Sequence, residues 1–280
     1  MPRRLAIVVT FLLLLVPRWA HGAPQRPYYL ALGDSLARGV QPLPNGSLVP
    51  TNQGYVDDLF AFYRLKHPLL QLKKLGCPGE TTTSMILGGV CKYATGNQLA
   101  EAIAFIQTHR VAFITLTIGG DNVLGCISTA GVITPGCVSD GLEAIGNDLP
   151  QIVSALRIAA GPTVPIVAAN YYDPFLAAYV LLPPPAGPDL ALQSLQITQL
   201  LNTGLESIYT GFGVPVADVA RAFRIIDFSN VPGFNIPLNV LLELAWTWIG
   251  APAPRGPDIH PNATGYAVIA GAFVRKIGAL

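Results

Sequence analysis

A serine near the start of the chain and a histidine near its end are the residues best suited to do chemistry. Ser35 follows the apolar run 28–32 within Gly33-Asp34-Ser35-Leu36, and His260 stands in Asp258-Ile259-His260-Pro261. A serine hydroxyl is a weak nucleophile until a base takes its proton, and histidine can act as that base at neutral pH. The two residues therefore predict a serine hydrolase.

Elimination favours His260 as the base. Beyond residue 22 the chain holds only two other histidines, His67 and His109. His67 precedes Pro68 at the end of a helical segment, and His109 ends another, where a cation interacts favourably with the helix dipole. We assign structural roles to both. His260 lies in a predicted loop, and Asp258, two residues before it, can orient the ring.

Apolar, β-rich segments alternate with segments of helical periodicity. The expected strands are 28–32, 69–75, 111–118, 164–170 and 214–219, and the expected helices are 55–66, 98–109, 141–158, 192–210 and 263–277. This alternation predicts a three-layer α/β/α domain with a parallel sheet of about five strands. Loops at the carboxyl ends of such strands share one edge of the sheet, so Ser35, the turn 77–81 and the segment 119–122 should converge there.

Two segments interrupt the alternation. Residues 181–189 contain three consecutive prolines, 183–185, and we expect a stiff loop there. Residues 231–257 mix leucine and tryptophan with prolines, and we expect a partly helical excursion beside the site. That excursion is a candidate wall for an apolar acyl group. The alternative is a packing insert that buries its own tryptophans.

The first 22 residues are expected to be a signal peptide. Arg3 and Arg4 precede a short apolar stretch, and small residues suggest cleavage before Ala23. An N-terminal anchor that is kept is the alternative. We therefore predict a secreted protein whose residues 23–280 form a single domain. Loss of the three leader arginines lowers the formal net charge from +1 to −2, and the chain shows no basic stripe that would bind nucleic acid.

The four cysteines lie beyond the predicted leader. In an exported protein an even number suggests two disulfides, and four cysteines allow three pairings. We favour the pairs close in sequence, Cys77 with Cys91 and Cys126 with Cys137. The spacing of cysteine and histidine does not support a zinc site, so we expect no metal.

The motifs and their order resemble those of the GDSL, or SGNH, hydrolases, which include secreted bacterial lipases and esterases. The matching blocks are Gly33-Asp34-Ser35-Leu36, Gly79, Gly119-Gly120-Asp121-Asn122 and Asp258-Ile259-His260-Pro261-Asn262. The resemblance implies a flavodoxin-like sheet, with Ser35 as nucleophile and His260 as base and then acid. It also implies an oxyanion hole formed by the N–H groups of Ser35 and Gly79 and an asparagine side chain, for which Asn122 is the candidate.

The chain departs from the family pattern at two places. The family's third block usually reads Gly-x-Asn-Asp, whereas here Asp121 precedes Asn122. An ionised Asp121 in the oxyanion position would repel the developing charge, so we assign the role to Asn122, with Asp121 as the alternative occupant. The family's acid normally lies three residues before the histidine, where this chain has Pro257. Asp258 is therefore the candidate third member of the triad, and a backbone carbonyl is the alternative.

These observations predict a secreted carboxylic-ester hydrolase, a lipase or esterase, that forms an acyl-serine intermediate without a metal or organic cofactor. Its partner would be a small-molecule or lipid ester. The composition, 51% hydrophobic and 12% charged, also allows transient contact with a lipid surface, and we expect a monomer. Two alternatives remain: a carbohydrate O-deacetylase of the same fold, and a non-catalytic secreted binding protein that has kept the fold.

Overall fold

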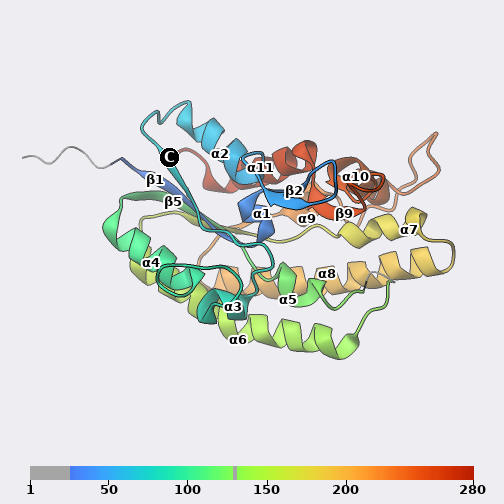
Figure 1. Cartoon of the computed structure of the whole chain (residues 1–280), viewed down its shortest axis with the longest axis horizontal. Coiled ribbons are helices and arrows are strands. Elements are labelled where there is room, and N and C mark those ends of the chain that lie inside the picture. The colour runs from blue at the N-terminus through green and yellow to red at the C-terminus, as the bar shows by residue number, and fades with distance from the viewer. Residues whose placement is uncertain (1–25, 129–130) are drawn as a thin grey trace, which may run out of the picture.

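The centre of the structure is a five-stranded parallel sheet with the strand order β4-β1-β5-β6-β7 (Figure 1). The computed structural model describes residues 26–128 and 131–280. The strands of this sheet are β1 (Tyr28–Gly33), β4 (Gln71–Lys74), β5 (Val111–Thr117), β6 (Ile166–Ala169) and β7 (Val216–Ala217). All five coincide with predicted strands, and the predicted α/β architecture with its parallel sheet is confirmed.

The register of the two central strands positions the site. In β1 and β5, Leu32 pairs with Leu116 and Gly33 pairs with Thr117, so both strands end side by side. Helices cover both faces of a parallel sheet of this kind, which explains why these strands read as continuous apolar runs. The segments that follow β1 and β5 therefore begin next to each other at the same edge, as expected.

Helices cover both faces of the sheet (Figure 1). On one face α2 (Tyr55–Arg64) packs against α11 (Ala263–Ile277), where the Tyr55 and Phe273 rings stack with centroids 4.8 Å apart. The helices of the other face are α3 (Thr82–Leu87), α4 (Gln98–Thr108), α5 (Gly120–Leu124), α6 (Pro135–Ala160) and α8 (Ala186–Gly211). A Cβ on Gly141 of α6 would lie 2.2 Å from the carbonyl oxygen of Asn122, so glycine allows α6 to pack tightly on α5.

Two helices begin earlier than the sequence predicted. α6 begins at Pro135 rather than at residue 141, and α8 begins at Ala186, inside the segment 181–189 that we expected to be a loop. That expectation is wrong from residue 186 onward, because Pro188 occupies the first turn of α8, where a helix needs no N–H donor. The shorter elements η1 (Pro174–Ala177) and α7 (Ala178–Leu181) lie between β6 and α8, and α9 (Val219–Ala222) follows β7.

The segment 231–257 supports the strand that carries His260. It contains α10 (Leu238–Trp246) and β8 (Thr247–Trp248), and β8 pairs in antiparallel fashion with β9 (Asp258–Pro261). The Trp246 ring meets the Phe223 ring edge to face at 5.3 Å. Near the first strand a short hairpin is formed by β2 (Val40–Pro42) and β3 (Leu48–Pro50), and α1 (Ser35–Arg38) precedes it.

The structure contains two disulfides, and they join the expected pairs. Cys77 is bonded to Cys91 and Cys126 to Cys137, with Cα atoms 6.1 Å and 5.5 Å apart. Within residues 26–128 and 131–280, no helix is both long and apolar enough to cross a bilayer. The predicted signal peptide, residues 1–22, lies outside the described residues and stays a prediction.

Glu243 on α10 provides a test of this packing. Its side chain is fully buried, and neither carboxylate oxygen has a hydrogen-bond partner among the described residues. Burial raises its pKa well above the ordinary value, and the negative charge of Asp173 acts in the same direction. The folded chain therefore holds this proton more tightly than the unfolded chain, so the free energy of unfolding falls as the pH rises above about 4.3, the ordinary glutamate pKa.

We expect Glu243→Gln to raise the melting temperature by a few degrees at pH 8. At pH 4.5 the change should be small, because the buried Glu243 side chain is then neutral, as glutamine is, and the unfolded chain also carries much of this proton. Differential scanning calorimetry at the two pH values measures this difference. Glu143→Gln, on an exposed position of α6, is the matched control and should shift neither value. Equal melting temperatures for wild type and Glu243→Gln at pH 8 would contradict an unpaired buried acid.

Candidate active site

A tight turn after β1 presents Ser35. Gly33 has φ of 120°, and a Cβ there would lie 1.8 Å from the carbonyl oxygen of Thr117, so glycine is required by both the conformation and the close approach of β5. Asp34 then caps α1 by accepting a hydrogen bond from the Leu36 N–H at 2.9 Å. Ser35 is the first residue of the helix, and its side chain is partly exposed.

The Asp34 carboxylate ties this turn to two other strands of the sheet. Besides the Leu36 N–H, it accepts hydrogen bonds from the Thr117 hydroxyl at 2.9 Å and from the Tyr171 hydroxyl at 2.5 Å. Thr117 ends β5, and Tyr171 follows β6. Burial raises the pKa of Asp34, while these three hydrogen bonds favour its ionised form. Asp34 is therefore a buried acceptor that fixes the turn rather than a group exposed to substrate.

Gln98 holds the other side of the same turn. Its amide oxygen accepts a hydrogen bond from the Gly33 N–H at 2.6 Å, and its amide nitrogen donates to the Gly33 carbonyl at 2.9 Å. The same nitrogen donates to Glu80 at 2.9 Å, and Glu80 also accepts a hydrogen bond from the Ser84 hydroxyl at 2.6 Å. The buried Gln98 thus links the serine turn to the loop that follows β4.

His260 and Asp258 are brought together on β9. One oxygen of the Asp258 carboxylate, Oδ1, lies 3.0 Å from both the backbone N and the ring Nδ1 of His260. The side chains are 9% and 12% exposed, so water competes little for this contact. An Nδ1–H that donates to Asp258 leaves Nε2 unprotonated, which is the form that a general base requires. The position three residues before His260, where the family usually has its acid, holds Pro257. Asp258, one residue later, makes the contact with the ring instead.

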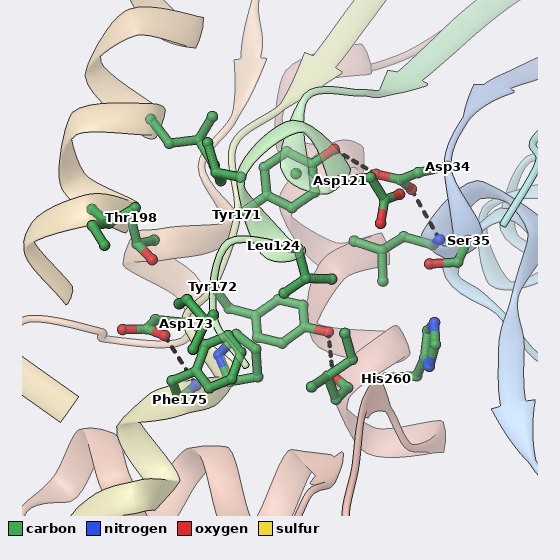
Figure 2. A pocket seen from close by; sticks show the side chains of 18 residues that line it. Asp34, Ser35, Asp121, Leu124, Tyr171, Tyr172, Asp173, Phe175, Thr198 and His260 are labelled. Atoms are coloured by element: carbon green, nitrogen blue, oxygen red, sulfur yellow. Dashed lines mark hydrogen bonds between the residues drawn. The ribbon is translucent and has the colours of Figure 1, made fainter. Parts of the chain in front are cut away.

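Ser35 and His260 line one pocket (Figure 2). Apart from Leu36, the apolar lining comes from the α5 region, η1, α8 and β9: Val123, Leu124, Ile127, Pro174, Phe175, Ile197, Leu201 and Ile259. Figure 2 shows Ser35, Asp34, Asp121 and His260 at one end, and Thr198 and Phe175 at the other. The enclosed cavity volume is about 80 Å³, so the pocket is small and lies open toward its mouth.

The segment 231–257 contributes no side chain to the lining of this pocket. The expectation that it forms an apolar wall is therefore wrong for the described structure. α10 instead packs against α11 and η1, and β8 pairs with β9, so the segment acts behind the site as a packing insert. α8 contributes Ile197 and Leu201 to the apolar lining instead. The sequence does not show which side of α8 faces the pocket, because that depends on the helices against which α8 packs.

The two candidates for the third oxyanion donor point in different directions. Asp121 lines the pocket, whereas the Asn122 side chain does not. Asn122 Oδ1 accepts a hydrogen bond from the Thr82 N–H at 2.9 Å, and its Nδ2 donates to the Thr82 hydroxyl at 2.9 Å. Gly79 lies in an exposed turn with φ of 81°, outside the lining of the pocket. The oxyanion assignments of Gly79 and Asn122 stay predictions.

Sequence reasoning missed the partners that hold the serine turn. Tyr171 and Gln98 are buried polar residues that bond to Asp34 and Gly33 from distant parts of the chain. The sequence offered one signal for such residues: a polar residue inside or directly after an apolar segment is expected to be buried and hydrogen-bonded. Among the described residues, no group of three or more histidine, cysteine or acidic side chains is arranged to hold a metal ion.

Comparison with known proteins identifies the family. The sequence model of the GDSL-like Lipase/Acylhydrolase family matches residues 31–268, and the chain belongs to this family. Family and fold together support an ester hydrolase. Comparison with curated protein sequences gives no significant match.

Solved structures share the fold at low sequence identity. Phospholipase A1 from Streptomyces albidoflavus NA297 has a TM-score of 0.54 and 16% identity, covering 90% of this chain and 99% of that one. The extracellular lipase of Streptomyces rimosus has a TM-score of 0.55 and 17% identity, covering 88% and 99%. A carbohydrate acetylesterase from Sinorhizobium meliloti has a TM-score of 0.51 and 13% identity, covering 90% and 99%.

The contact between Asp258 and His260 predicts a catalytic role for Asp258 as an orienting group. We expect Asp258→Ala to lower kcat for an aryl ester by roughly 10²- to 10⁴-fold, because the ring would lose the acceptor that selects its tautomer. Steady-state kinetics measures the loss. Asp189→Ala, an exposed acid in the first turn of α8, is the control and should leave kcat unchanged. A similar kcat for Asp258→Ala and wild type would assign the orienting role to another group.

Proposed function

We propose that the protein is a secreted serine esterase or lipase that hydrolyses carboxylic esters of apolar acyl groups through an acyl-serine intermediate. The observation that carries the proposal is the shared pocket: Ser35 and the His260–Asp258 pair stand at one end of a mainly apolar chamber. The family provides the reaction class, and the lining of the chamber provides the preference for an apolar acyl chain.

The reaction begins when Ser35 Oγ attacks the ester carbonyl carbon. His260 Nε2 takes the hydroxyl proton, while the carbonyl electron pair moves onto the oxygen to give a tetrahedral oxyanion. When the carbon–oxygen bond to the alcohol breaks, the leaving oxygen takes the proton from His260. Water then repeats the sequence on the acyl-serine and releases the acid. Asp258 holds the ring and stabilises the imidazolium that forms in both halves.

The acyl chain would lie along the apolar side of the pocket. Val123, Leu124 and Ile127 face it from the segment after β5, and Ile197 and Leu201 face it from α8. Apolar surface removed from water stabilises a complex by about 25 cal/mol per Å², so each methylene that contacts this wall adds to binding. Because Ser35 is at the end of this wall, acyl chains longer than acetyl should be preferred.

Export fits the composition of the described chain. Two disulfides form and persist in an oxidising compartment, which supports a role outside the cytoplasm. Val180, Leu181 and Leu182 are exposed at the end of α7, next to η1, and they are the candidate residues for transient contact with a lipid surface. Sedimentation with phospholipid vesicles tests that contact, and size-exclusion chromatography tests the expected monomer.

Covalent labelling is the direct test of the nucleophile. A fluorophosphonate probe should label the wild-type protein, and Ser35→Ala should abolish both labelling and hydrolysis of p-nitrophenyl esters. Ser47→Ala, in the exposed turn before β3, is the control and should leave both intact. Absence of labelling in the wild type would favour the non-catalytic binding protein. Faster release of acetate from acetylated xylan than hydrolysis of any p-nitrophenyl acyl ester would favour the carbohydrate O-deacetylase.

A substitution in α8 tests the acyl wall. We expect Ile197→Trp to lower kcat/KM for p-nitrophenyl octanoate at least tenfold while changing the value for the acetate less than twofold, because the larger ring fills the far part of the pocket. Leu200→Trp is the matched control on the same helix, since Leu200 is 61% exposed and lies outside the lining. If both esters lose activity equally, Ile197 does not contact the acyl chain.

A further inference from the structure

The position beside Ser35 that an amide donor would fill in the family pattern holds a carboxyl group. Asp121 lines the pocket together with Ser35 and His260, and Figure 2 shows its carboxyl group next to Asp34 at the serine end. Asn122 cannot serve there without breaking its two hydrogen bonds to Thr82. Figure 2 shows no hydrogen bond between the Asp121 carboxyl group and the other residues drawn around the pocket, so its polar atoms are free to meet a substrate.

The surroundings of Asp121 disfavour its ionised form. Asp34 approaches from the end of β1 and Glu80 from the loop after β4, and both carboxylates accept several hydrogen bonds from fixed donors. The bonds to Asp34 favour its ionised form, although burial raises its pKa. Asp121 has no such donor in Figure 2, so among the carboxyl groups at the serine end of the pocket it is the one whose neutral form is least opposed by hydrogen bonds.

Four further titratable groups line the same pocket: Tyr171, Tyr172, Asp173 and His260. Tyr172 donates its hydroxyl hydrogen to the Ile259 carbonyl. Burial raises the pKa of Asp173 to about 7, but Asp173 accepts hydrogen bonds from the Phe175 N–H and the Ser194 hydroxyl and lies toward the Phe175 end of the pocket in Figure 2. The Tyr171 hydroxyl donates its proton to Asp34, so it offers none to Asp121. His260 stands across the pocket, where its ring faces Asp258. Burial raises the pKa of Asp121 to about 7, and the negative charges of Asp34 and Glu80 act in the same direction. A carboxyl group kept neutral in this way can donate a hydrogen bond from its O–H.

Resting on the function proposed above, we propose that Asp121 is a catalytic residue that acts as a neutral carboxylic acid and donates its O–H to the oxyanion formed on the Ser35 adduct. The proton stays on Asp121 throughout: the serine proton passes to His260 and then to the leaving alcohol, and the Asp121 hydrogen bond only stabilises the charge on the former carbonyl oxygen. The Asp121-Asn122 order thus replaces the usual amide donor with an acid, which works only while that acid is protonated.

The proposal predicts a pH dependence that asparagine should remove. In the wild type, kcat/KM should fall about tenfold per pH unit above about 7 as Asp121 loses its proton. The asparagine of Asp121→Asn can donate a hydrogen bond at every pH, so the kcat/KM of this variant should stay level over the same range. The ratio of its kcat/KM to that of the wild type should therefore be near one at pH 6 and rise as the pH increases above 7. Asp121→Ala should lower kcat about 10²- to 10³-fold at pH 6, the typical loss for one oxyanion donor.

The measurement is the kcat/KM profile of each protein from pH 5.5 to 9 with a p-nitrophenyl ester. Asp140→Asn, which removes an exposed acid from α6, should follow the wild-type profile. If Asp121→Asn falls with the wild type above pH 7, or if Asp121→Ala is as active as wild type at pH 6, the proposal is wrong.

Two other outcomes separate the possible errors. A loss of turnover for Asn122→Ala much larger than for Asp121→Ala, with both variants folded by circular dichroism, would return the donor role to Asn122. Activity that survives Ser35→Ala would overturn the proposed function itself, whatever the Asp121 profiles show. Activity that depends on Ser35 while the Asp121 variants behave like the wild type would overturn only the inference about Asp121.

Discussion

The buried carboxylate of Asp34 is the constraint on which the candidate site depends. It accepts hydrogen bonds from its own helix, from the end of β5 and from the residue after β6, so one side chain sets the relative positions of three adjoining loops. A buried charge is costly unless it is fully bonded. Loss of any one donor would therefore leave the Asp34 carboxylate less well bonded and weaken its hold on the other two loops. The conformation of the serine turn thus depends on all three hydrogen bonds as well as on its local sequence.

The same charge shapes the electrostatics around it. Asp34 and Glu80 accept hydrogen bonds from fixed donors, and their negative charges, after burial, raise the pKa of Asp121. Across the pocket, Asp258 Oδ1 lies 3.0 Å from His260 Nδ1. The site thus holds three acids in different surroundings: Asp34 bonded to the serine turn, Asp258 paired with His260, and Asp121 on the lining of the pocket. Their different hydrogen-bond environments distinguish carboxyl groups that are chemically alike.

The sequence allowed prediction of the elements whose burial is nearly complete. β1 and β5 are continuous apolar runs because helices cover both faces, and α11 occupies the predicted range 263–277. Ser35 and His260 could be chosen as candidates because local motifs and a scarcity of histidines single them out, and both line one pocket. The acyl wall and the partners of Asp34 were not predictable. Tyr171 lies 137 residues from Asp34 in sequence, and contacts of that range depend on packing that no local pattern records.

The antiparallel pair of β8 and β9 has a consequence for the stability of the site. Ser35 begins α1 directly after β1 of the central sheet, whereas His260 lies on β9, which pairs with β8 in a short ribbon outside that sheet. Short ribbons of this kind belong to the parts of a protein that open locally at less free energy than global unfolding. Opening of this ribbon alone would move His260 away from Ser35 while the central sheet stays folded. The arrangement of these two side chains can therefore be lost at less free energy than the fold itself.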